Sequence, residues 1–278
     1  MSSRRSFIAA TASATVLTAF SARAQASTLR WVVPYPPGGG TDVLGRTLVE
    51  SMRGSLGMTI VVENKPGAST NIAAQDVARA APDGRTVLQA DNALMAFNEH
   101  LFKKLPVDPD KDFTYIGGIG KFPLALVVHP DFPAKSFKEF MAYVRANPGK
   151  VNYASPGNGS PHHLAMEMFK NRTRTFLVHI PYRGAAPAMQ DVIAGQVPVM
   201  FLDLASGLPI MQSGKVRVLA YGGKAGTPLL PGVPTLIDEN VRDVEVFAFQ
   251  GLLGPTGMPP ATVQRLNAEL ILAVAATT

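Results

Sequence analysis

The stretch LRWVVPYPPGGGTDVLGR, residues 29–46, determines the first unit of the fold. Its apolar start, Leu29–Pro34, predicts a β-strand, and the prolines and three glycines that follow predict a tight loop. A helix is expected over residues 41–56, because apolar residues recur there at helical spacing, at positions 43, 44, 48, 49 and 52. Loops that lead from a strand into a helix often hold phosphate or carboxylate groups at the helix N-terminus.

The same alternation of strands and helices continues through the rest of the chain. Further strands are expected at Thr59–Glu63, Thr86–Ala90, Val151–Ala154, Leu177–Ile180, Val197–Leu202 and Lys215–Tyr221. Further helices are expected at Asn71–Ala81, Phe137–Ala146, Pro161–Lys170, Pro187–Ala194 and Pro260–Ala275. Such alternation is typical of an α/β protein whose parallel sheet is covered by helices on both faces.

Two long apolar strands stand out from this pattern, at Leu124–His129 and Val244–Leu253. The alternation of strand and helix starts again after the first of them. We therefore interpret the chain as two α/β units joined by two extended crossings, with a cleft between the units. Because open α/β sheets bind ligands beyond the carboxyl ends of their strands, the cleft is the expected binding site.

The N-terminal segment Met1–Ala26 has the pattern of an export signal. Arg4 and Arg5 precede an apolar stretch that is too short to span a membrane, and an A-x-A-like cleavage site follows at residues 24–26. The pair of arginines fits a twin-arginine signal, while an ordinary Sec signal remains the alternative. In either case, the mature protein is expected in the periplasm.

Composition excludes several classes of function. The formal net charge of the full chain is +6, and three of its arginines lie in the export segment, so the mature chain is only mildly basic. No run of Lys or Arg and no interleaving of basic and aromatic residues is present, which argues against nucleic acid as a partner. The chain has no cysteine, so neither disulfides nor thiolate chemistry contribute.

Three loops offer backbone amides at the start of a helix. The first is Gly38–Gly40, with Gly39 expected to need a positive φ and Thr41 expected as N-cap. The second is Ser155–Ser160, with Ser160 as N-cap and a proline at the first helical position. The third is Tyr182–Pro187. Together these loops predict an anion pocket built from backbone amides. Arg183 either supplements this pocket with its positive charge or is simply solvated.

The common catalytic and cofactor motifs are absent from the sequence. The glycines are not followed by G-K-[ST], the third glycine of the dinucleotide fingerprint is missing, and no G-x-S-x-G elbow occurs. His162 and His163 have no acid or cysteine at ligand spacing, so no metal is expected; one of them should pack or cap and the other should line the cleft. Asp42 and Asp203 lack a partnering acid. These features predict binding without catalysis and without a cofactor.

Several motifs give the chain a resemblance to a known family. They are YPPGGGTD at 35–42, VENKPGA at 62–68, PDG at 82–84, HIPYRG at 179–184 and LPGVPT at 230–235. In order and spacing they resemble the Bug family, the periplasmic substrate-binding proteins of tripartite tricarboxylate transporters. The resemblance covers essentially all of the mature chain. It implies a type II periplasmic-binding-protein fold, in which two α/β domains with two crossover strands close over a small carboxylate.

The resemblance also implies how the ligand is held. Backbone amides and ordered water from two facing loops, here Pro36–Asp42 and Ser155–Ser160, would bind a ligand carboxylate, and Asp42 would orient the first loop. Asp203 follows an apolar strand and is expected at the mouth of the cleft, where it either favours a ligand ammonium or hydroxyl over a second carboxylate or caps a helix. The complete expected ligand-binding set is Tyr35, Pro36, Pro37, Gly38, Gly39, Gly40, Thr41, Asp42, Asn92, Ser155, Gly157, Asn158, Gly159, Ser160, His163, Arg183, Gly184, Ala185 and Asp203.

The function that follows is capture of a small carboxylate, such as a citrate-like acid, a dicarboxylic amino acid or an aromatic acid. The expected partners are the membrane permease subunits of a tripartite transporter, with the receptor itself a monomer. The alternatives are a ligand-sensing partner of a two-component system and a periplasmic hydrolase or lyase. The expected domains are 27–123 with 247–278, and 124–246. Family members usually continue further, so the last helices of the first domain are expected to be missing.

Overall fold

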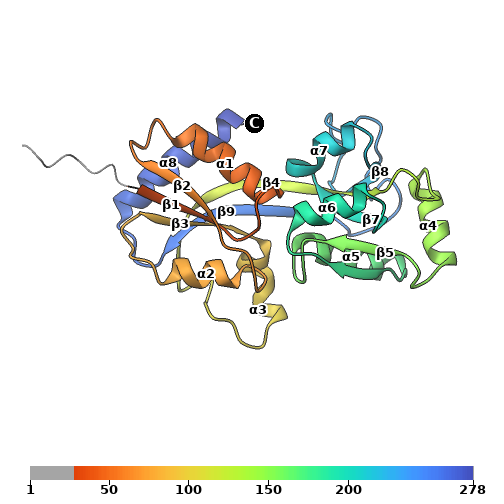
Figure 1. Ribbon diagram of the computed structural model, residues 1–278, viewed down its shortest axis with the longest axis horizontal. Coiled ribbons are helices and arrows are strands. Elements are labelled where there is room, and N and C mark those ends of the chain that lie inside the picture. The colour runs from red at the N-terminus through yellow and green to blue at the C-terminus, as the bar shows by residue number, and fades with distance from the viewer. Residues whose placement is uncertain (1–27, 278) are drawn as a thin grey trace, which may run out of the picture.

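The computed structural model describes residues 28–277 as two α/β halves joined by two long strands (Figure 1). The predicted export signal lies outside the described residues. The first half contains β1 (Thr28–Val33), α1 (Gly40–Met52), β2 (Thr59–Asn64), α2 (Asn71–Ala78), β3 (Thr86–Asp91), η1 (Ala93–Phe97), α3 (Asn98–Leu101) and α8 (Pro260–Thr277). Its strands β1, β2 and β3 are parallel, as the alternation of strands and helices predicts.

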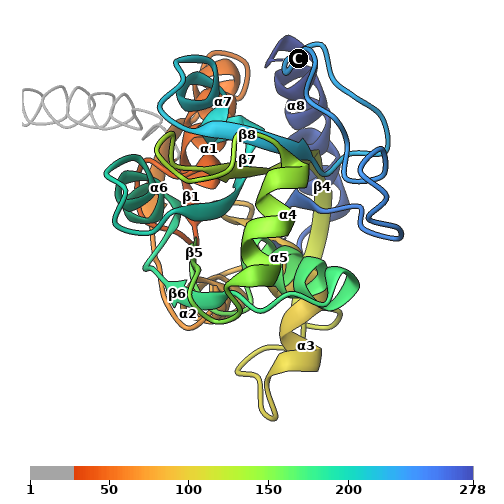
Figure 2. The same cartoon turned by 90° about the vertical axis from the view of Figure 1, so that its right-hand side faces the viewer.

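The second half repeats this architecture. It contains α4 (Phe137–Ala146), β5 (Asn152–Ser155), α5 (Pro161–Thr173), β6 (Val178–Pro181), α6 (Ala185–Ile193), β7 (Val199–Asp203), α7 (Leu204–Gln212) and β8 (Arg217–Tyr221). Strand β5 pairs in parallel with β6 and β7. Figure 2 shows α6 and α7 on one side of these strands and α4 and α5 on the other.

Strands β4 (Phe113–Val128) and β9 (Phe247–Pro255) connect the halves and lie side by side in Figure 1. The first part of β4, Phe113–Pro123, pairs antiparallel with β9, which also pairs with β3. The last part, Leu124–Val128, pairs with β7 and β8. The strand order is therefore β2-β1-β3-β9-β4-β7-β5-β6, with β8 paired to β4.

The sequence pattern missed the first two thirds of β4. The segment before Leu124 contains Gly117, Gly118 and Gly120, and glycine is unfavourable in strands. The register with β9 shifts at two places there, between Tyr115 and Gly117 and between Gly118 and Gly120. These irregularities suit a glycine-rich strand, since bulges and glycines allow a strand to bend.

Helix α7 was also missed, because Gly207 and Pro209 lie within it and both disfavour helix interiors. The helix forms nevertheless. Asp203 caps its first turn by accepting a hydrogen bond from Ser206 N at 2.8 Å. Pro209 stands at the sixth position, so the helix tolerates a missing N–H donor beyond its first turn.

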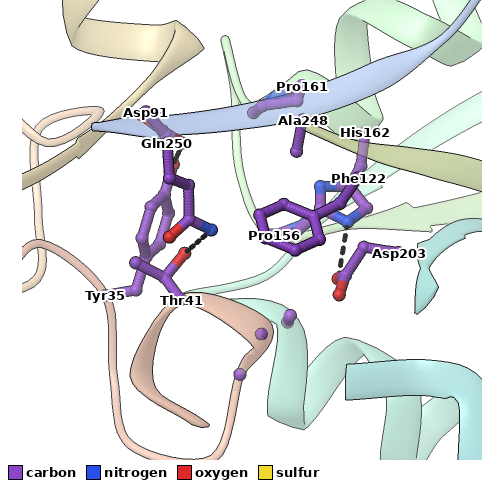
Figure 3. Close-up of a pocket in the computed structure, with 13 residues that line it drawn as sticks. Tyr35, Thr41, Asp91, Phe122, Pro156, Pro161, His162, Asp203, Ala248 and Gln250 are labelled. Carbon is purple, nitrogen blue, oxygen red and sulfur yellow. Dashed lines mark hydrogen bonds and ion pairs between the residues drawn. The ribbon is translucent and has the colours of Figure 1, made fainter. Parts of the chain in front are cut away.

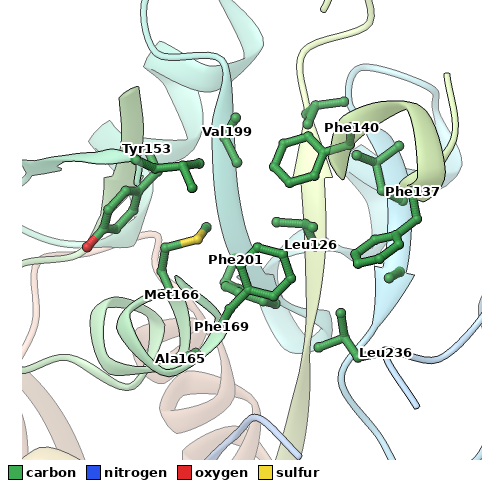
Figure 4. Close-up of a cluster of buried hydrophobic side chains, with 14 of the residues drawn as sticks. Leu126, Phe137, Phe140, Tyr153, Ala165, Met166, Phe169, Val199, Phe201 and Leu236 are labelled. Atoms are coloured by element: carbon green, nitrogen blue, oxygen red, sulfur yellow. The ribbon is translucent and has the colours of Figure 1, made fainter. Parts of the chain in front are cut away.

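Buried hydrophobic side chains form a separate core on each face of each half. Figure 4 shows the largest core, where Phe140 and Phe169 lie at a ring-centroid distance of 6.4 Å. Phe201 of β7 packs against Phe169, and Leu126 of β4 belongs to the same cluster. Removing one such ring typically costs about 3–5 kcal/mol of folding free energy. The cores therefore make rigid supports for the loops at the strand ends.

Candidate functional site

The loop before α1 is held in place by Asp42. Its Oδ2 accepts a hydrogen bond from Gly38 N at 3.0 Å, and its carboxylate also pairs with Arg46 and accepts from Asn64 Nδ2 at 2.8 Å. Burial alone would raise the pKa of Asp42, but these hydrogen bonds lower it on balance. The ionised carboxylate thus fixes the loop through the Gly38 amide without lining the pocket described below.

Two details of this loop differ from the sequence-based expectation. The glycine with positive φ is Gly38, at +84°, whereas Gly39 has an extended conformation with φ −84°. Gly39 is the N-cap, and Thr41 already lies in the helix. The turn therefore lies one residue earlier than expected, at the glycine whose amide donates to Asp42. The first N–H groups of a helix have no partner within the helix, and no side chain caps those of α1.

The loop Ser155–Ser160 before α5 is held mainly by neutral groups. Ser155 Oγ accepts from Gly157 N at 3.1 Å and lies 2.6 Å from His179 Nε2. Gly159 N donates to His163 Nδ1 at 3.2 Å. Ser160 caps α5 as predicted, accepting from His163 N, and proline follows at the first helical position. The two histidine rings stack at 4.2 Å, so they form a support beneath the loop.

The loop before α6 meets the α1 loop across the space between the halves. Gly184, with φ +119°, is the N-cap of α6, so the helix begins at Ala185, two residues earlier than predicted. A Cβ placed on Gly39 would lie 3.3 Å from Ala185 Cβ. A Cβ on Gly40 would lie 2.5 Å from Asp203 Oδ1. A side chain at position 40 would therefore force Asp203 or α1 to move, whereas one at position 39 would only tighten the contact with Ala185.

A pocket lies where these loops meet the connecting strands (Figure 3). The empty space between its lining atoms is about 470 Å³ when the open solvent at its mouth is included. The lining residues are Tyr35, Gly39, Gly40, Thr41, Asp91, Phe122, Pro156, Pro161, His162, Ala185, Asp203, Ala248 and Gln250. Neither Lys nor Arg lines this pocket. Positive potential comes instead from the N-termini of α1, α5 and α6.

The polar side chains of the pocket are paired with one another. Tyr35 OH donates to Asp91 Oδ2 at 2.7 Å, and Gln250 Nε2 donates to Thr41 Oγ1 at 3.2 Å. His162 Nε2 lies 3.2 Å from Asp203 Oδ2, as the dashed line in Figure 3 marks. The phenyl ring of Phe122 and the side chain of Ala248 add apolar surface.

Two buried carboxylates in the pocket differ in their electrostatics. Burial raises the pKa of Asp91, against the hydrogen bonds that it accepts from Tyr35 and Ala93 N. Burial also opposes ionisation of Asp203, but the hydrogen bond and charge of His162 and the donors of Ser206 lower its pKa on balance. Asp203 is therefore ionised at neutral pH, both capping α7 and facing the pocket.

The structure distributes the predicted site residues among three places. Those that line the pocket are Tyr35, Gly39, Gly40, Thr41, Ala185 and Asp203. Those that line a neighbouring outer cavity, together with Tyr35, are Pro36, Gly157, Asn158, Ser160, Arg183 and Gly184. Those that line neither are Pro37, Gly38, Asp42, Asn92, Ser155, Gly159 and His163.

Asn92 and His163 line neither cavity, and their contacts lie elsewhere. Asn92 binds β9 instead of the pocket: its Oδ1 accepts from Phe249 N at 2.7 Å and its Nδ2 donates to Phe247 O. His163 stacks beneath the loop, while its neighbour His162 faces the pocket. Successive residues of a helix point about 100° apart, so the sequence could show that only one would line the cleft but not which one.

Sequence reasoning missed seven lining residues: Asp91, Phe122, Pro156, Pro161, His162, Ala248 and Gln250. Two of them carried a signal. Asp91 is the polar end of the buried strand β3, and Gln250 is the polar residue inside an apolar strand. A buried polar residue at the carboxyl end of a strand, or alone in an apolar strand, needs a hydrogen-bond partner. The apolar residues had no such signal.

Comparison with known proteins agrees with this geometry. Residues 44–277 match the tripartite tricarboxylate transporter family receptor. A UPF0065 protein in the gbd 5′ region of Cupriavidus necator is 37% identical over 268 residues, covering 95% of this chain and 81% of that protein. The chain belongs to the tripartite tricarboxylate transporter receptor family, also known from the Bug proteins.

Solved structures of relatives share the fold. The periplasmic binding protein BugD superposes with a TM-score of 0.84 at 35% identity, covering 88% of this chain and 82% of that one. Rpa4515 from R. palustris, solved with adipate, gives 0.85 at 30% identity, with 87% and 81% covered. MatC from Rhodopseudomonas palustris, solved with malate, gives 0.81 at 32% identity, with 88% and 84% covered. The family has the α/β fold of periplasmic binding proteins.

Family membership confirms two of the predictions from sequence. The family consists of receptors that bind solutes for transport, so binding without catalysis is its function. It is also a family of periplasmic binding proteins. Within residues 28–277, none of the helices combines the length and apolar character that a membrane crossing needs. The same residues contain no group of three or more His, Cys, Asp or Glu that could hold a metal ion.

Proposed function

We propose that this chain is the solute receptor that captures a small carboxylate in the pocket between its halves and delivers it to the permease of a tripartite transporter. The observation that carries the proposal is the convergence of three helix N-termini, of α1, α5 and α6, on a pocket whose lining contains neither Lys nor Arg. Free N–H groups and aligned helix dipoles favour an anion at this place.

The amides of the α1 loop support this proposal most directly. Val43 N is the first amide of α1 to donate within the helix, to Gly39 O at 3.0 Å. The amides of Gly40 and Thr41 precede it, and both residues line the pocket. Charge-assisted hydrogen bonds from backbone N–H groups are among the stronger polar contacts in proteins. Relatives solved with adipate and with malate support the carboxylate class.

We also propose that residues 27–123 with 247–278 form one domain and residues 124–246 the other. In support, β4 changes partners between Pro123 and Leu124, and β9 begins at Phe247. Ser69 Oγ of the first domain donates to Asn158 O of the second at 2.8 Å, so the two domains are already in contact beside the pocket. We further propose that the receptor acts as a monomer in the periplasm, exported through the Met1–Ala26 signal by the twin-arginine or Sec route.

A thermal-shift screen tests the proposed ligand class. Adipate, malate, succinate, citrate, glutamate and nicotinate should be compared with the corresponding neutral amides, which keep the shape and remove the charge. A bound acid at 100 times its Kd should stabilise the protein by about 2.7 kcal/mol. Stabilisation by the amides and by none of the acids would contradict an anion site.

A further inference from the structure

A chain of hydrogen bonds runs from the core of the first half to the pocket. Trp31 Nε1 donates to Gln89 Oε1 at 2.8 Å. Gln89 Nε2 donates to Thr41 O at 2.9 Å and to Gln250 Oε1 at 2.6 Å. Gln250 Nε2 then donates to Thr41 Oγ1 at 3.2 Å, as a dashed line in Figure 3 marks. Trp31 and Gln89 are completely buried, whereas Thr41 and Gln250 line the pocket.

The direction of each hydrogen bond in this chain follows from Trp31. An indole N–H can only donate, so the atom of Gln89 beside Trp31 must be the oxygen. The nitrogen of Gln89 then faces Thr41 O, which can only accept, and the side chain of Gln250. Since Gln89 donates to it, Gln250 must turn its oxygen to Gln89 and its nitrogen to Thr41 Oγ1. Reversing either amide would place two donors or two acceptors together.

This fixed orientation leaves hydrogens for a ligand. Gln250 Nε2 carries two hydrogens, and within residues 28–277 only Thr41 Oγ1 accepts one of them. The Thr41 hydroxyl accepts in this contact, so it keeps its own hydrogen to donate. Gln250 is 7% exposed and Thr41 is partly exposed, and both line the pocket. Because Gln89 occupies its oxygen, the Gln250 amide meets a ligand as a donor only.

The two buried carboxylates of the pocket have other partners. Asp91 lies opposite Gln250 in the register of β3 with β9, but it accepts from Tyr35 OH at 2.7 Å, and burial raises its pKa. Asp203 is paired with His162 at 3.2 Å. Among the described residues, neither carboxylate accepts from the Gln250 amide.

We propose that Gln250 and Thr41 bind the ligand carboxylate directly, through the second Nε2 hydrogen and the hydroxyl hydrogen. Gln89 and Trp31 are then positioning residues that keep the Gln250 amide turned as a donor. This inference rests on the proposed function, because Thr41 lies in the first turn of α1, beside the amides that would hold the same carboxylate.

The proposal predicts how the receptor distinguishes an acid from its amide. A carboxylate has two oxygens that accept, whereas a carboxamide has one oxygen and an NH₂ group that only donates. The NH₂ group would face the Gln250 donor without forming a hydrogen bond. The orientation of one buried glutamine thus selects acids over the corresponding carboxamides.

Calorimetry on the purified protein tests the two binding side chains, with adipate, malate and nicotinate as probes. For the acid that binds, Thr41→Val should weaken the affinity about tenfold, since it removes a hydrogen bond to a charged group. Thr41→Ser keeps the hydroxyl and should bind about tenfold more tightly than Thr41→Val. Gln250→Glu replaces the donor by a carboxylate oxygen and should lose at least about tenfold. Gln264→Glu is the matched control, because Gln264 is exposed on α8 and lines neither cavity.

A second measurement tests the positioning residues, namely the affinity of each acid relative to its neutral amide, adipamide, malamide or nicotinamide. Gln89→Met keeps the length of the side chain but releases the Gln250 amide, which can then turn its oxygen to the ligand. The preference for the acid should fall about tenfold, the value of one hydrogen bond to a charged group. Trp31→Phe should shift it in the same direction and decides alone if Gln89→Met fails to fold. General loosening of the fold would weaken both ligands alike and leave the preference unchanged.

The possible outcomes separate this inference from the proposed function. Equal affinities of Thr41→Val and Thr41→Ser, unchanged binding in Gln250→Glu, or a constant acid preference in Gln89→Met and Trp31→Phe would overturn the inference and leave a carboxylate receptor. Absence of binding by every acid of the thermal-shift screen would contradict the carboxylate receptor itself, and the inference with it.

Discussion

The two loops that face each other across the pocket look alike in sequence but are held by different chemistry. The loop before α1 depends on an ionised carboxylate, because Asp42 accepts from Gly38 N and pairs with Arg46. The loop before α5 depends on neutral imidazoles, because Gly159 N donates to His163 Nδ1 and Ser155 Oγ contacts His179. The comparison teaches that similar glycine loops can depend on different charge states, an ionised carboxylate in one loop and neutral imidazoles in the other.

The largest expected effect comes from adding a side chain to Gly40, where α1 approaches Asp203. In Gly40→Ala the new Cβ would lie 2.5 Å from Asp203 Oδ1, so one wall must move. Overpacking of this kind typically costs about 1–3 kcal/mol, and we expect a loss of roughly ten- to hundredfold in ligand affinity by calorimetry. Folding should persist, because Gly40 has a helical backbone that alanine readily adopts.

Gly54→Ala is the matched control, since no atom lies within 4 Å of the position of its Cβ. Its affinity should equal that of the wild type. If Gly40→Ala also binds normally, the closely approaching walls do not contribute to ligand capture.

The second prediction tests the carboxylate that holds the first loop. Asp42→Asn removes the negative charge beside Arg46 and weakens the acceptor for Gly38 N. Because hydrogen bonds to charged groups contribute about 1.5–3 kcal/mol, we expect a loss of roughly tenfold in affinity. Asp238→Asn is a suitable control, as this aspartate interacts with Thr235 and lines neither cavity. Equal losses in the two variants would show that the effect is not specific to the loop.

The third prediction concerns the imidazoles of the second loop, which hold the loop in their neutral form. Burial lowers the pKa of His163, and burial together with the neighbouring His163 lowers the pKa of His179 to about 4. Glu167 favours protonation of both rings, while Lys170 opposes it, and Tyr153 stacks on His179. As the pH falls below about 6.5, the unfolded chain takes up protons before the folded chain does.

The free energy of unfolding should therefore be full above about pH 6.5 and should decrease as the pH falls toward 4. Urea unfolding at pH 7, 6 and 5 measures this slope, and His179→Gln should reduce it. His100→Gln is the control, because His100 is exposed, lies beside Glu99 and lines neither cavity. By contrast, Asp42 has a lowered pKa, so its contribution is present above the unfolded pKa near 4 and is lost only as the pH falls further. An unchanged slope in His179→Gln would remove the proposed distinction between the loops.

The comparison also explains which features could be predicted from sequence. Apolar alternation and caps gave the strands and helices, including Phe137–Ala146 with its boundaries and the Ser160 cap, because these features depend on local chemistry. The family resemblance supplied the fold class. The choice between His162 and His163 could not be predicted, since it depends on helix rotation relative to β7, which carries Asp203. The start of β4 could not be predicted for a similar reason. Its glycines disfavour a strand locally, and the strand forms by pairing with β9, which is distant in the sequence.

The smallest expected effect is that of the one cation in the predicted site. Arg183 is exposed and lines the outer cavity instead of the pocket, so solvent and salt screen its charge. We expect Arg183→Ala to change the affinity by no more than about threefold, with the difference disappearing at high salt. Arg242→Ala provides the control, because Arg242 is exposed and lines neither cavity. Calorimetry at two salt concentrations separates the screened charge from a direct contact. If Arg183→Ala abolishes binding while Gly40→Ala leaves it intact, the anion is held by a cation in the outer cavity, and the glycine loop does not form the binding site.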